Sequence, residues 1–369
     1  MYVHDSSSMA FIAQRYFPVE ISAIYFSEHS VITQVKNPKF FVKNGLASQV
    51  NQIKELSKEY DLFLCYGFIS AVVCYLAEVN YIMYFADAYI DPENRIRRKI
   101  SPLMKYTLQA LCKDALEYAT ETIAYAPHDA QILKKYRPQS KNIFLPIDTE
   151  MFNSKVKKIE LDQNKFTFFS PQRIDPDKGQ LIMWDAINLA KSDFVVLQTD
   201  WGTGEYYQKV LKTKPEKVKI IPVVKRENMP SYLASADAIL GQISKTTCGS
   251  VEREATLCKT PVFCYAPFSF SENDPFYKKS TNPADIAEYI DRIVTDKNFR
   301  EELVKIQSEW IEKTFDNNKT VQEWHQVFEE AVKKKPNYKI KFKYVLLLKL
   351  ITIMERLIGR DLSSIGQRP

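Results

Sequence analysis

The sequence predicts an α/β protein built from two Rossmann-like domains. Its 369 residues exceed the usual size of a single hydrophobic core. Short apolar runs alternate with longer amphipathic stretches, as they do when strands alternate with crossover helices. The alternation occurs twice, on either side of a polar, aperiodic stretch from Asp148 to Lys158. Two such sheets are expected to face each other, with a ligand in the cleft between them.

Apolar runs place the individual elements. The first half has expected strands at 21–25, 61–66, 81–85, 122–126 and 142–145, with helices at 45–60 and 100–119. The second half has expected strands at 166–170, 194–198, 218–221, 238–240 and 261–265, with crossover helices at 178–190, 205–211, 229–234 and 251–257. A helical run is expected over 282–296, 297–313 and 320–333. The resulting domains are 1–150 and 151–332, followed by a basic amphipathic extension at 333–369.

The net charge of +6 is unevenly distributed along the chain. From Lys333 onward ten Lys and Arg stand against two acidic residues, which gives +8 and leaves −2 for the preceding residues. A nucleic-acid-binding body would carry its positive charge on a folded face, so this class is not expected. The basic residues of 333–360 are interleaved with apolar ones, which suits a helix on an anionic membrane surface. The alternative is a helix docked on the protein body with a solvated lysine stripe.

The cysteines and the N-terminus indicate where the protein works. Six cysteines without a CxxC pair lie mostly among apolar neighbours, which is typical of buried free thiols in a reducing compartment. The start of the chain has neither a basic region nor an apolar one, so no secretory signal is expected. No uncharged apolar run is long enough to span a bilayer. We therefore expect a cytoplasmic protein, peripheral on the inner face of the membrane if the basic extension binds lipid.

The first motif that carries chemistry is the segment 170–179, which follows an expected strand and opens a helix. It places Arg173 and Lys178 at the carboxyl end of the sheet, where α/β folds bind phosphates. Arginine offers a planar fork to phosphate oxygens, and lysine offers a point charge. The alternative is a solvated loop with two incidental basic residues.

The second motif spans 244–255, where small and hydroxyl residues lead directly into a helix. The unpaired N–H groups at such a helix end attract anions, which favours phosphate binding near Gly249 and Ser250. Glu254, one turn inside the helix, is placed to accept hydrogen bonds from ribose hydroxyls. The alternative is a capped helix with acidic residues in its first turn, and it applies most strongly to Glu252.

The order of these motifs resembles the C-terminal domain of glycosyltransferase family 4, the retaining "group 1" class with the GT-B fold. The resemblance rests on P-Q-R…K-G at 171–179, W-G-T-G at 201–204, the segment 221–237, and E-A…K-T-P-V at 254–262. Four elements that occur in the family's order between residues 171 and 262 make a specific signal. The similarity covers residues from about 120 to 331 and is much thinner before that.

The resemblance implies a hexosyltransferase-type enzyme that moves a sugar from a nucleoside-diphosphate sugar to a glycan or lipid-linked acceptor. Arg173 and Lys178 would bind the diphosphate and stabilise the charge of the leaving group. Glu254 would hold the ribose. The remaining donor contacts would be backbone groups of Gly249 and Ser250 at the phosphates and the loop of Pro222 and Val223 at the base. No metal or other cofactor is implied, and Asp175-Pro176-Asp177 is interpreted as a turn in preference to a metal site.

The chain also departs from the family pattern. Thr246 occupies the position of a family glutamate beside the donor sugar, so the way the sugar is held differs here. The first half has no Gly-Gly loop, and Ser6 lies in the nearest substitute. The acceptor-side histidine is also missing, which leaves Asp87 and His4 as candidates to assist the acceptor. For Asp87 a turn or capping role is the alternative, and for His4 a structural one.

Two other functions are compatible with the same fold. A non-catalytic GT-B scaffold that binds a nucleotide or glycan is suggested by Thr246 and by the thin motifs of the first half. A nucleotide-sugar epimerase should carry several acidic and histidine residues in its cleft. The chain has only four histidines, so the epimerase is the least favoured.

Overall fold

The computed structural model describes residues 9–25, 35–36, 38–40, 45–85, 102–161, 164–243, 247–271, 273–334, 336 and 338–358. The chain forms two compact units. The first combines Met1–Pro146 with Asn317–Arg368, and the second is Ile147–Asp316. Each unit contains its own parallel sheet, as expected for two Rossmann-like domains.

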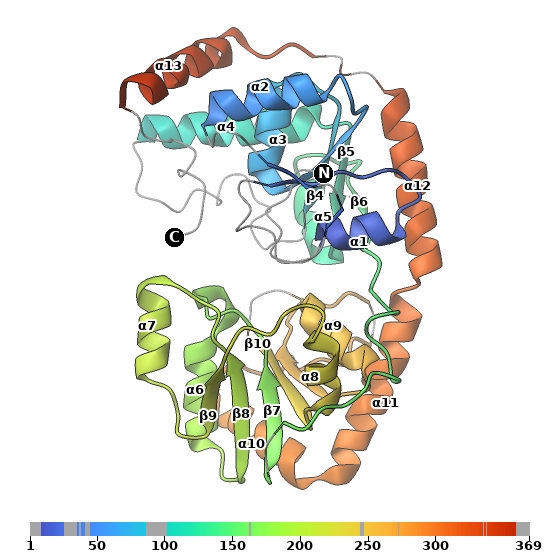
Figure 1. Cartoon of the computed structure of the whole chain (residues 1–369), viewed down its shortest axis with the longest axis vertical. Coiled ribbons are helices and arrows are strands. Elements are labelled where there is room, and N and C mark those ends of the chain that lie inside the picture. The colour runs from blue at the N-terminus through green and yellow to red at the C-terminus, as the bar shows by residue number, and fades with distance from the viewer. Residues whose placement is uncertain are drawn as a thin grey trace. The chain divides into compact units, whose positions relative to one another are not determined.

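The second unit is built on a five-stranded parallel sheet in the order β11-β10-β7-β8-β9 (Figure 1). Its strands are β7 (Phe166–Ser170), β8 (Phe194–Thr199), β9 (Val218–Ile221), β10 (Ala238–Ile243) and β11 (Val262–Tyr265). All five coincide with expected strands to within three residues at each end. Strands of a parallel sheet are covered on both faces, which explains why they are continuous apolar runs.

Helices cover both faces of this sheet. They are α6 (Gln180–Leu189), α7 (Gly204–Lys212), α8 (Met229–Ser235), α9 (Ser250–Leu257), α10 (Pro283–Thr295) and α11 (Lys297–Thr314), with a short 3₁₀ helix η2 at Pro176–Lys178. Phe168 belongs to the core cluster that includes Trp184 of α6 and Ile290 of α10. The next residue, Phe169, lies against Tyr232 of α8, with ring centroids 5.4 Å apart. Successive side chains of a strand point to opposite faces, so α6 and α10 cover one face and α8 covers the other.

The first unit contains the four-stranded parallel sheet β3-β4-β5-β6 and a separate pair, β1-β2. The strands are β1 (Ile24–Tyr25), β2 (Lys39–Phe40), β3 (Phe63–Tyr66), β4 (Tyr81–Phe85), β5 (Glu121–Ala124) and β6 (Lys141–Asn142). The helices before the second unit are α1 (Met9–Tyr16), α2 (Leu46–Leu56), α3 (Gly67–Leu76), α4 (Pro102–Tyr118) and α5 (Pro127–Lys134). Helix α3 was not expected, because its sequence is apolar all round and lacks a helical period. It is buried in the core, as such helices are.

The C-terminal helices α12 (Asn317–Lys333) and α13 (Phe342–Ile358) belong to the first unit. This differs from the expected boundary at 332, which placed α12 with the second domain. The indole Nε1 of Trp324 in α12 donates a hydrogen bond to the Phe144 carbonyl at 2.7 Å. Its ring also packs 5.2 Å from Phe17 and 5.4 Å from Tyr84. The buried indole therefore ties α12 to β4 and to two other segments of the first unit that are far away in the sequence.

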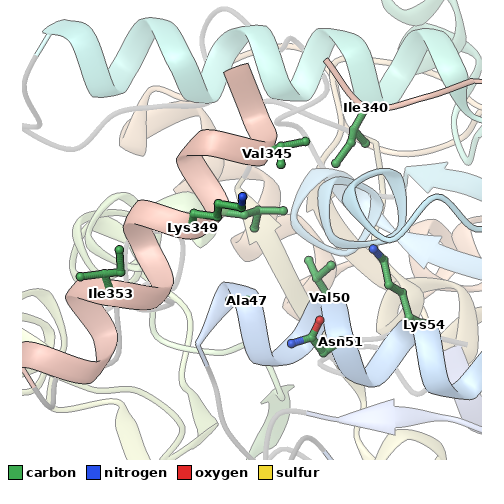
Figure 2. A pocket seen from close by; sticks show the side chains of 9 residues that line it. Ala47, Val50, Asn51, Lys54, Ile340, Val345, Lys349 and Ile353 are labelled. Atoms are coloured by element: carbon green, nitrogen blue, oxygen red, sulfur yellow. The ribbon is translucent and has the colours of Figure 1, made fainter. Parts of the chain in front are cut away.

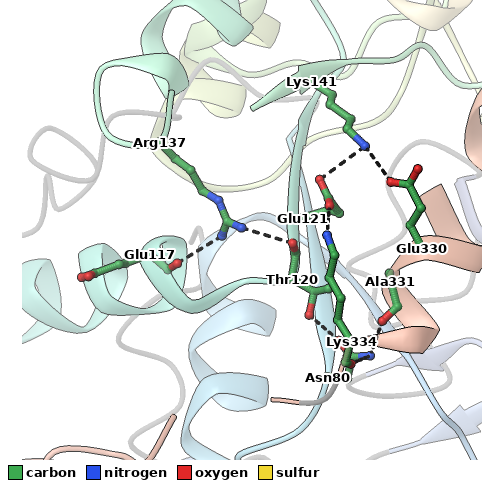
Figure 3. Close-up of polar contacts among 9 residues, drawn as sticks. All are labelled: Asn80, Glu117, Thr120, Glu121, Arg137, Lys141, Glu330, Ala331 and Lys334. Carbon is green, nitrogen blue, oxygen red and sulfur yellow. Dashed lines mark hydrogen bonds and ion pairs between the residues drawn. The ribbon is translucent and has the colours of Figure 1, made fainter. Parts of the chain in front are cut away.

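Polar contacts continue this attachment beyond Trp324 (Figure 3). Asn80 donates from Nδ2 to the Ala331 carbonyl at 2.8 Å, and Lys334 Nζ lies 2.6 Å from Glu121 Oε1. Further along, Lys341 and Tyr344 both donate to the Asp114 carboxylate at 2.7 Å. The basic extension is thus docked on the body of the first unit over its described residues. Among the helices that the structure describes, none has the length and hydropathy needed to cross a bilayer.

Candidate functional site

The order of the strands creates a switch point in the second unit. The chain runs outward from β7 through β8 to β9, and then crosses back to place β10 on the other side of β7. At such a point the loops after the two central strands diverge and leave a crevice at their carboxyl ends. The two motifs singled out in the sequence are the loops that follow β7 and β10. The topology therefore brings together two segments that lie some 70 residues apart in the chain.

The loop after β7 carries Arg173, which is partly exposed. Its Nη2 lies 3.0 Å from Asp175 Oδ2, while the side chain of Gln180 donates to the Arg173 carbonyl at 2.8 Å. The loop closes at Gly179, whose φ is +72°. A Cβ at Gly179 would lie 2.5 Å from the Ile243 carbonyl oxygen of β10. Glycine is required there because the conformation is left-handed and because the backbone of β10 passes so close.

Lys178 links the two loops. Its Nζ donates a hydrogen bond to Oε1 of Gln242, at the end of β10. The Gln242 side chain in turn donates to the Thr247 carbonyl at 2.9 Å, and its backbone N–H donates to Glu252 Oε1 at 2.8 Å. The ammonium group is therefore held next to the loop after β10 and to the first turn of α9.

Glu252 anchors this network from below. Its side chain is fully buried, and Oε1 also accepts a hydrogen bond from Gln172 Nε2 at 2.9 Å. The other oxygen, Oε2, has no hydrogen-bond partner among the described residues. A Cβ at Gly249 would lie 2.5 Å from that oxygen, so Gly249 packs directly on the carboxylate. Glu252 is an acidic residue in the first turn of α9, as the alternative interpretation of this segment expected, but the helix has no side-chain cap, and the buried carboxylate supports the loops of the site.

The N-terminus of α9 presents backbone donors to the same crevice. Gly249 is the N-cap residue and Ser250 the first helical residue, and no side chain caps the helix. The N–H groups of an uncapped first turn carry partial positive charge. The positively charged Arg253 lies near this end of the helix. Its Nη2 lies 3.1 Å from Ser250 Oγ, and its guanidinium lies over the Phe315 ring at 5.0 Å.

Glu254 forms a pair that the sequence did not predict. Its Oε2 lies 2.8 Å from Nη1 of Arg226, and both side chains are largely buried. The Arg226 guanidinium also stacks on Phe152 at 4.4 Å. Burial raises the pKa of Glu254, and the positive charge and hydrogen bond of Arg226 lower it in part. Arg226 follows β9 at the carboxyl edge of the sheet, and that position is the signal that could have identified it.

The structure places the other predicted residues as follows. Pro222 and Val223 lie exposed at the start of the loop after β9, which is the edge strand furthest from β11. Thr246, Asp87, His4 and Ser6 lie outside the described residues.

The carboxylate of Asp175 is engaged by groups of its own turn and of the preceding loop. Asp175 accepts a hydrogen bond from the Asp177 backbone N–H at 3.0 Å, in addition to its pair with Arg173. Within the described ranges no cluster of three His, Cys, Asp or Glu side chains is arranged to hold a metal ion.

The buried glutamines of this site were not predicted from the sequence. Gln198 of β8 is fully buried and donates from Nε2 to the Gln172 carbonyl at 2.8 Å. Together with Gln172 and Gln242 it forms a polar layer beneath the loops. The available signal was an amide side chain at the carboxyl end of otherwise apolar strands. Buried amides must be hydrogen-bonded, so they mark a place where loops are held in one arrangement.

A comparison with protein families identifies this half of the chain. Residues 151–310 match the model of the family "Glycosyl transferases group 1". This match covers 160 of the 369 residues. A sequence search of curated proteins finds no match to the chain.

Solved structures show that the GT-B fold extends over both units. The chain is similar to Anabaena HepE in complex with UDP and glucose, with a TM-score of 0.69 and 16% identity over 89% of this chain and 98% of that one. Sucrose-phosphate synthase from Thermosynechococcus elongatus matches with a TM-score of 0.65 and 14% identity, over 87% and 91% of the two chains. A glycosyltransferase from Rickettsia africae matches with a TM-score of 0.60 and 16% identity, over 85% of this chain and 90% of that one. The glycosyl transferase domain is therefore the second half of a two-domain GT-B protein.

Proposed function

We propose that this protein is a retaining hexosyltransferase that moves a sugar from a nucleoside-diphosphate sugar to a glycan or lipid-linked acceptor. The observation that carries the proposal is the hydrogen bond from Lys178 to Gln242 within the group 1 domain. It holds a cation at the switch point, beside the first turn of α9, where a diphosphate would be received. The HepE complex with UDP and glucose makes UDP-glucose the first donor to test.

The donor diphosphate is assigned to the loops after β7 and β10. Arg173 and Lys178 would bind its oxygens from one side, and the N–H groups at Gly249 and Ser250 would bind from the other. As the bond to the sugar breaks, negative charge grows on the departing phosphate. Cations and dipoles that are already fixed in place stabilise that charge without reorganisation, which is the largest effect available to such a site. Gln242 supplies this fixation for Lys178.

The nucleoside is assigned to the side of Glu254. Its carboxylate would accept hydrogen bonds from the ribose hydroxyls, and Arg226 would keep it oriented through Oε2. Pro222 and Val223 would border the base. Thr246 would hydrogen-bond the sugar in place of a charged residue.

The acceptor is assigned to the first unit, with His4, Ser6 and Asp87 as the candidate contacts. Retention would follow from departure and attack on the same face of the sugar, so no protein nucleophile is required.

We also propose that the reaction needs no metal, because Arg173, Lys178 and the α9 terminus together supply the positive charge. Turnover that is equal in EDTA and in Mg²⁺ supports this assignment, and a strict requirement for Mg²⁺ contradicts it.

A cytoplasmic location is proposed on the basis of the cysteines. All six are free and buried, and Cys65 Sγ donates a hydrogen bond to Cys74 Sγ at 3.4 Å. Thiols persist in this state in a reducing compartment.

The experiment that tests the function is a thermal-shift panel with UDP- and GDP-sugars, followed by measurement of nucleotide release. A donor that binds the native state raises the melting temperature. We expect one nucleotide-sugar family to do so and to release its nucleotide when acceptor is added. A thermal shift with no release under any acceptor supports the non-catalytic scaffold instead. No shift with any donor contradicts the proposed donor site.

A further inference from the structure

Among the side chains of helix α13 that the structure describes, those on one face dock on the first unit. Tyr344 is 1% exposed, donates to Asp114 and packs edge-on against Tyr75 at 6.2 Å. Leu347 and Leu348 pack against the same core. The docked face therefore accounts for only part of the apolar surface of this helix.

The opposite face carries a stripe of exposed apolar side chains. Phe342, Leu346, Leu350 and Ile353 are between 45% and 74% exposed. Four of the ten large apolar side chains that are exposed among the described residues thus lie on this one helix. At about 100° per residue, the four fall within an arc of about 80°. A concentration of this kind on one face marks an interaction site, whereas scattered exposed residues do not.

Lysines lie on both edges of this stripe. On the same helical projection Lys349 falls about 20° before its first edge and Lys343 about 20° beyond its last. Both are exposed. From Ala331 to Met354 the sequence contains seven lysines and no Asp or Glu. Glu355 follows in the last turns of α13. The combination of an apolar centre and basic edges is typical of a helix that lies in the headgroup layer of an anionic membrane.

A groove runs beside the stripe, between α13 and α2 (Figure 2). It has a volume of about 510 Å³, and Val50, Val345, Leu348 and Ile353 form apolar parts of its wall. Lys54 of α2 and Lys349 of α13 also line it. Ile353 and Lys349 belong to both the groove and the outer face, so the two form one continuous surface. The acyl chain of a lipid fits the apolar wall of this groove, and a lipid phosphate fits the ammonium groups of Lys54 and Lys349.

We propose that this surface, comprising the exposed stripe of α13 and the adjoining groove, docks on an anionic lipid bilayer. A second copy of the chain fits less well, because a self-complementary contact would set the lysines of one copy against those of the other. The helix has 17 residues, and no described helix is suited to spanning a bilayer, so α13 lies on the membrane and does not cross it. This inference concerns the first unit and is independent of the donor site proposed above.

Sedimentation of the full-length protein with lipid vesicles tests the proposal. We expect binding to vesicles that contain phosphatidylglycerol, weaker binding at high salt, and little binding to phosphatidylcholine alone. The double variant Leu346→Glu/Leu350→Glu should lose about tenfold in bound fraction. The matched control Leu189→Glu/Val332→Glu changes two exposed apolar residues of α6 and α12 and should bind as the parent does.

The charge of the surface is tested separately. Lys343→Glu/Lys349→Glu should reduce binding to anionic vesicles, while Lys305→Glu/Lys313→Glu on α11 should not. Circular dichroism and donor-induced thermal shifts identify any variant that fails to fold or loses the donor site. Equal binding to neutral and anionic vesicles overturns the proposal. So does undiminished binding of the folded Leu346→Glu/Leu350→Glu variant, or a change confined to the oligomeric state measured by light scattering.

Discussion

The Arg226 guanidinium lies 2.8 Å from Glu254 Oε2, and the loop after β9 is thereby tied to the first turns of α9. The two side chains come from elements that are not neighbours in the sheet, since β9 is an edge strand and α9 follows β10. A buried ion pair adds little to the net free energy of folding, because desolvation offsets the attraction between the charges. Loss of one partner is destabilising, because the other charge is then buried without compensation.

Arg226→Met is expected to destabilise the protein by about 3 kcal/mol at neutral pH, because the Glu254 carboxylate then loses its buried counter-charge. Burial already raises the pKa of Glu254, and removal of Arg226 raises it further. A carboxyl group with a raised pKa favours folding below its ordinary pKa, and this stabilisation is lost as pH rises through the folded-state value. The deficit should therefore shrink in acid. Urea unfolding of the variant and the parent at several pH values measures it.

The double variant Arg226→Met/Glu254→Gln provides the control for this pair. It removes both charges and should recover most of the lost stability at neutral pH. If the single Arg226 variant is as stable as the parent at pH 7, the pair is not a buried ion pair of the folded protein.

Arg173→Ala and Lys178→Ala should each lower kcat by about 10² to 10³, because each removes a fixed positive group from the site of the developing phosphate charge. Arg173 lies in the loop after β7 and Lys178 ends the 3₁₀ helix η2. Both are partly exposed, so the melting temperature should change little. Lys165→Ala, which changes an exposed lysine paired with Asp193, is the matched control and should leave turnover intact. Unchanged turnover in both site variants would remove the diphosphate assignment.

Glu252→Ala should destabilise the protein by about 2–4 kcal/mol, because it leaves Gln172 Nε2 and the Gln242 N–H buried without their acceptor. Glu205 is also an acidic first-turn residue, in α7, but it is exposed. Glu205→Ala should therefore cost well under about 1 kcal/mol. Denaturant unfolding of the two variants compares them directly. Equal losses would mean that Glu252 acts only through the helix dipole.

Gly179→Ala and Gly204→Ala separate backbone strain from steric conflict. Both residues have positive φ, +72° and +79°, but only a Cβ at Gly179 meets a neighbouring backbone atom. Gly204→Ala should cost about 1 kcal/mol from conformation alone. Gly179→Ala should cost more, about 2–3 kcal/mol, and should also lower turnover because it displaces Lys178. Thermal unfolding with activity measurement checks both, and similar values for the two variants would contradict the close approach.

Local sequence patterns determined most of the strands and the location of the donor motifs. Apolar runs such as 166–170 or 194–198 identify strands because a buried parallel strand needs apolar residues on both faces. Arg173 and Lys178 could be placed at a carboxyl edge because they follow such a run directly. Helix α3 could not be identified in this way, because a segment buried on all sides shows no period.

Long-range packing decided the rest. The amphipathic pattern of α12 is the same whichever unit it covers, and only the contact of Trp324 with Phe144 assigns it to the first. Two sets of contacts could not be read from the sequence, because separation along the chain does not reveal distance in space. They are the pair of Arg226 with Glu254 and the hydrogen bonds from Lys178 through Gln242 to Glu252. Most strands and the charged loops could be identified from sequence, because these features depend on neighbours along the chain. The pairing of charges and the exposed face of each helix follow from the folded arrangement, because burial depends on surfaces that folding brings together from distant parts of the chain.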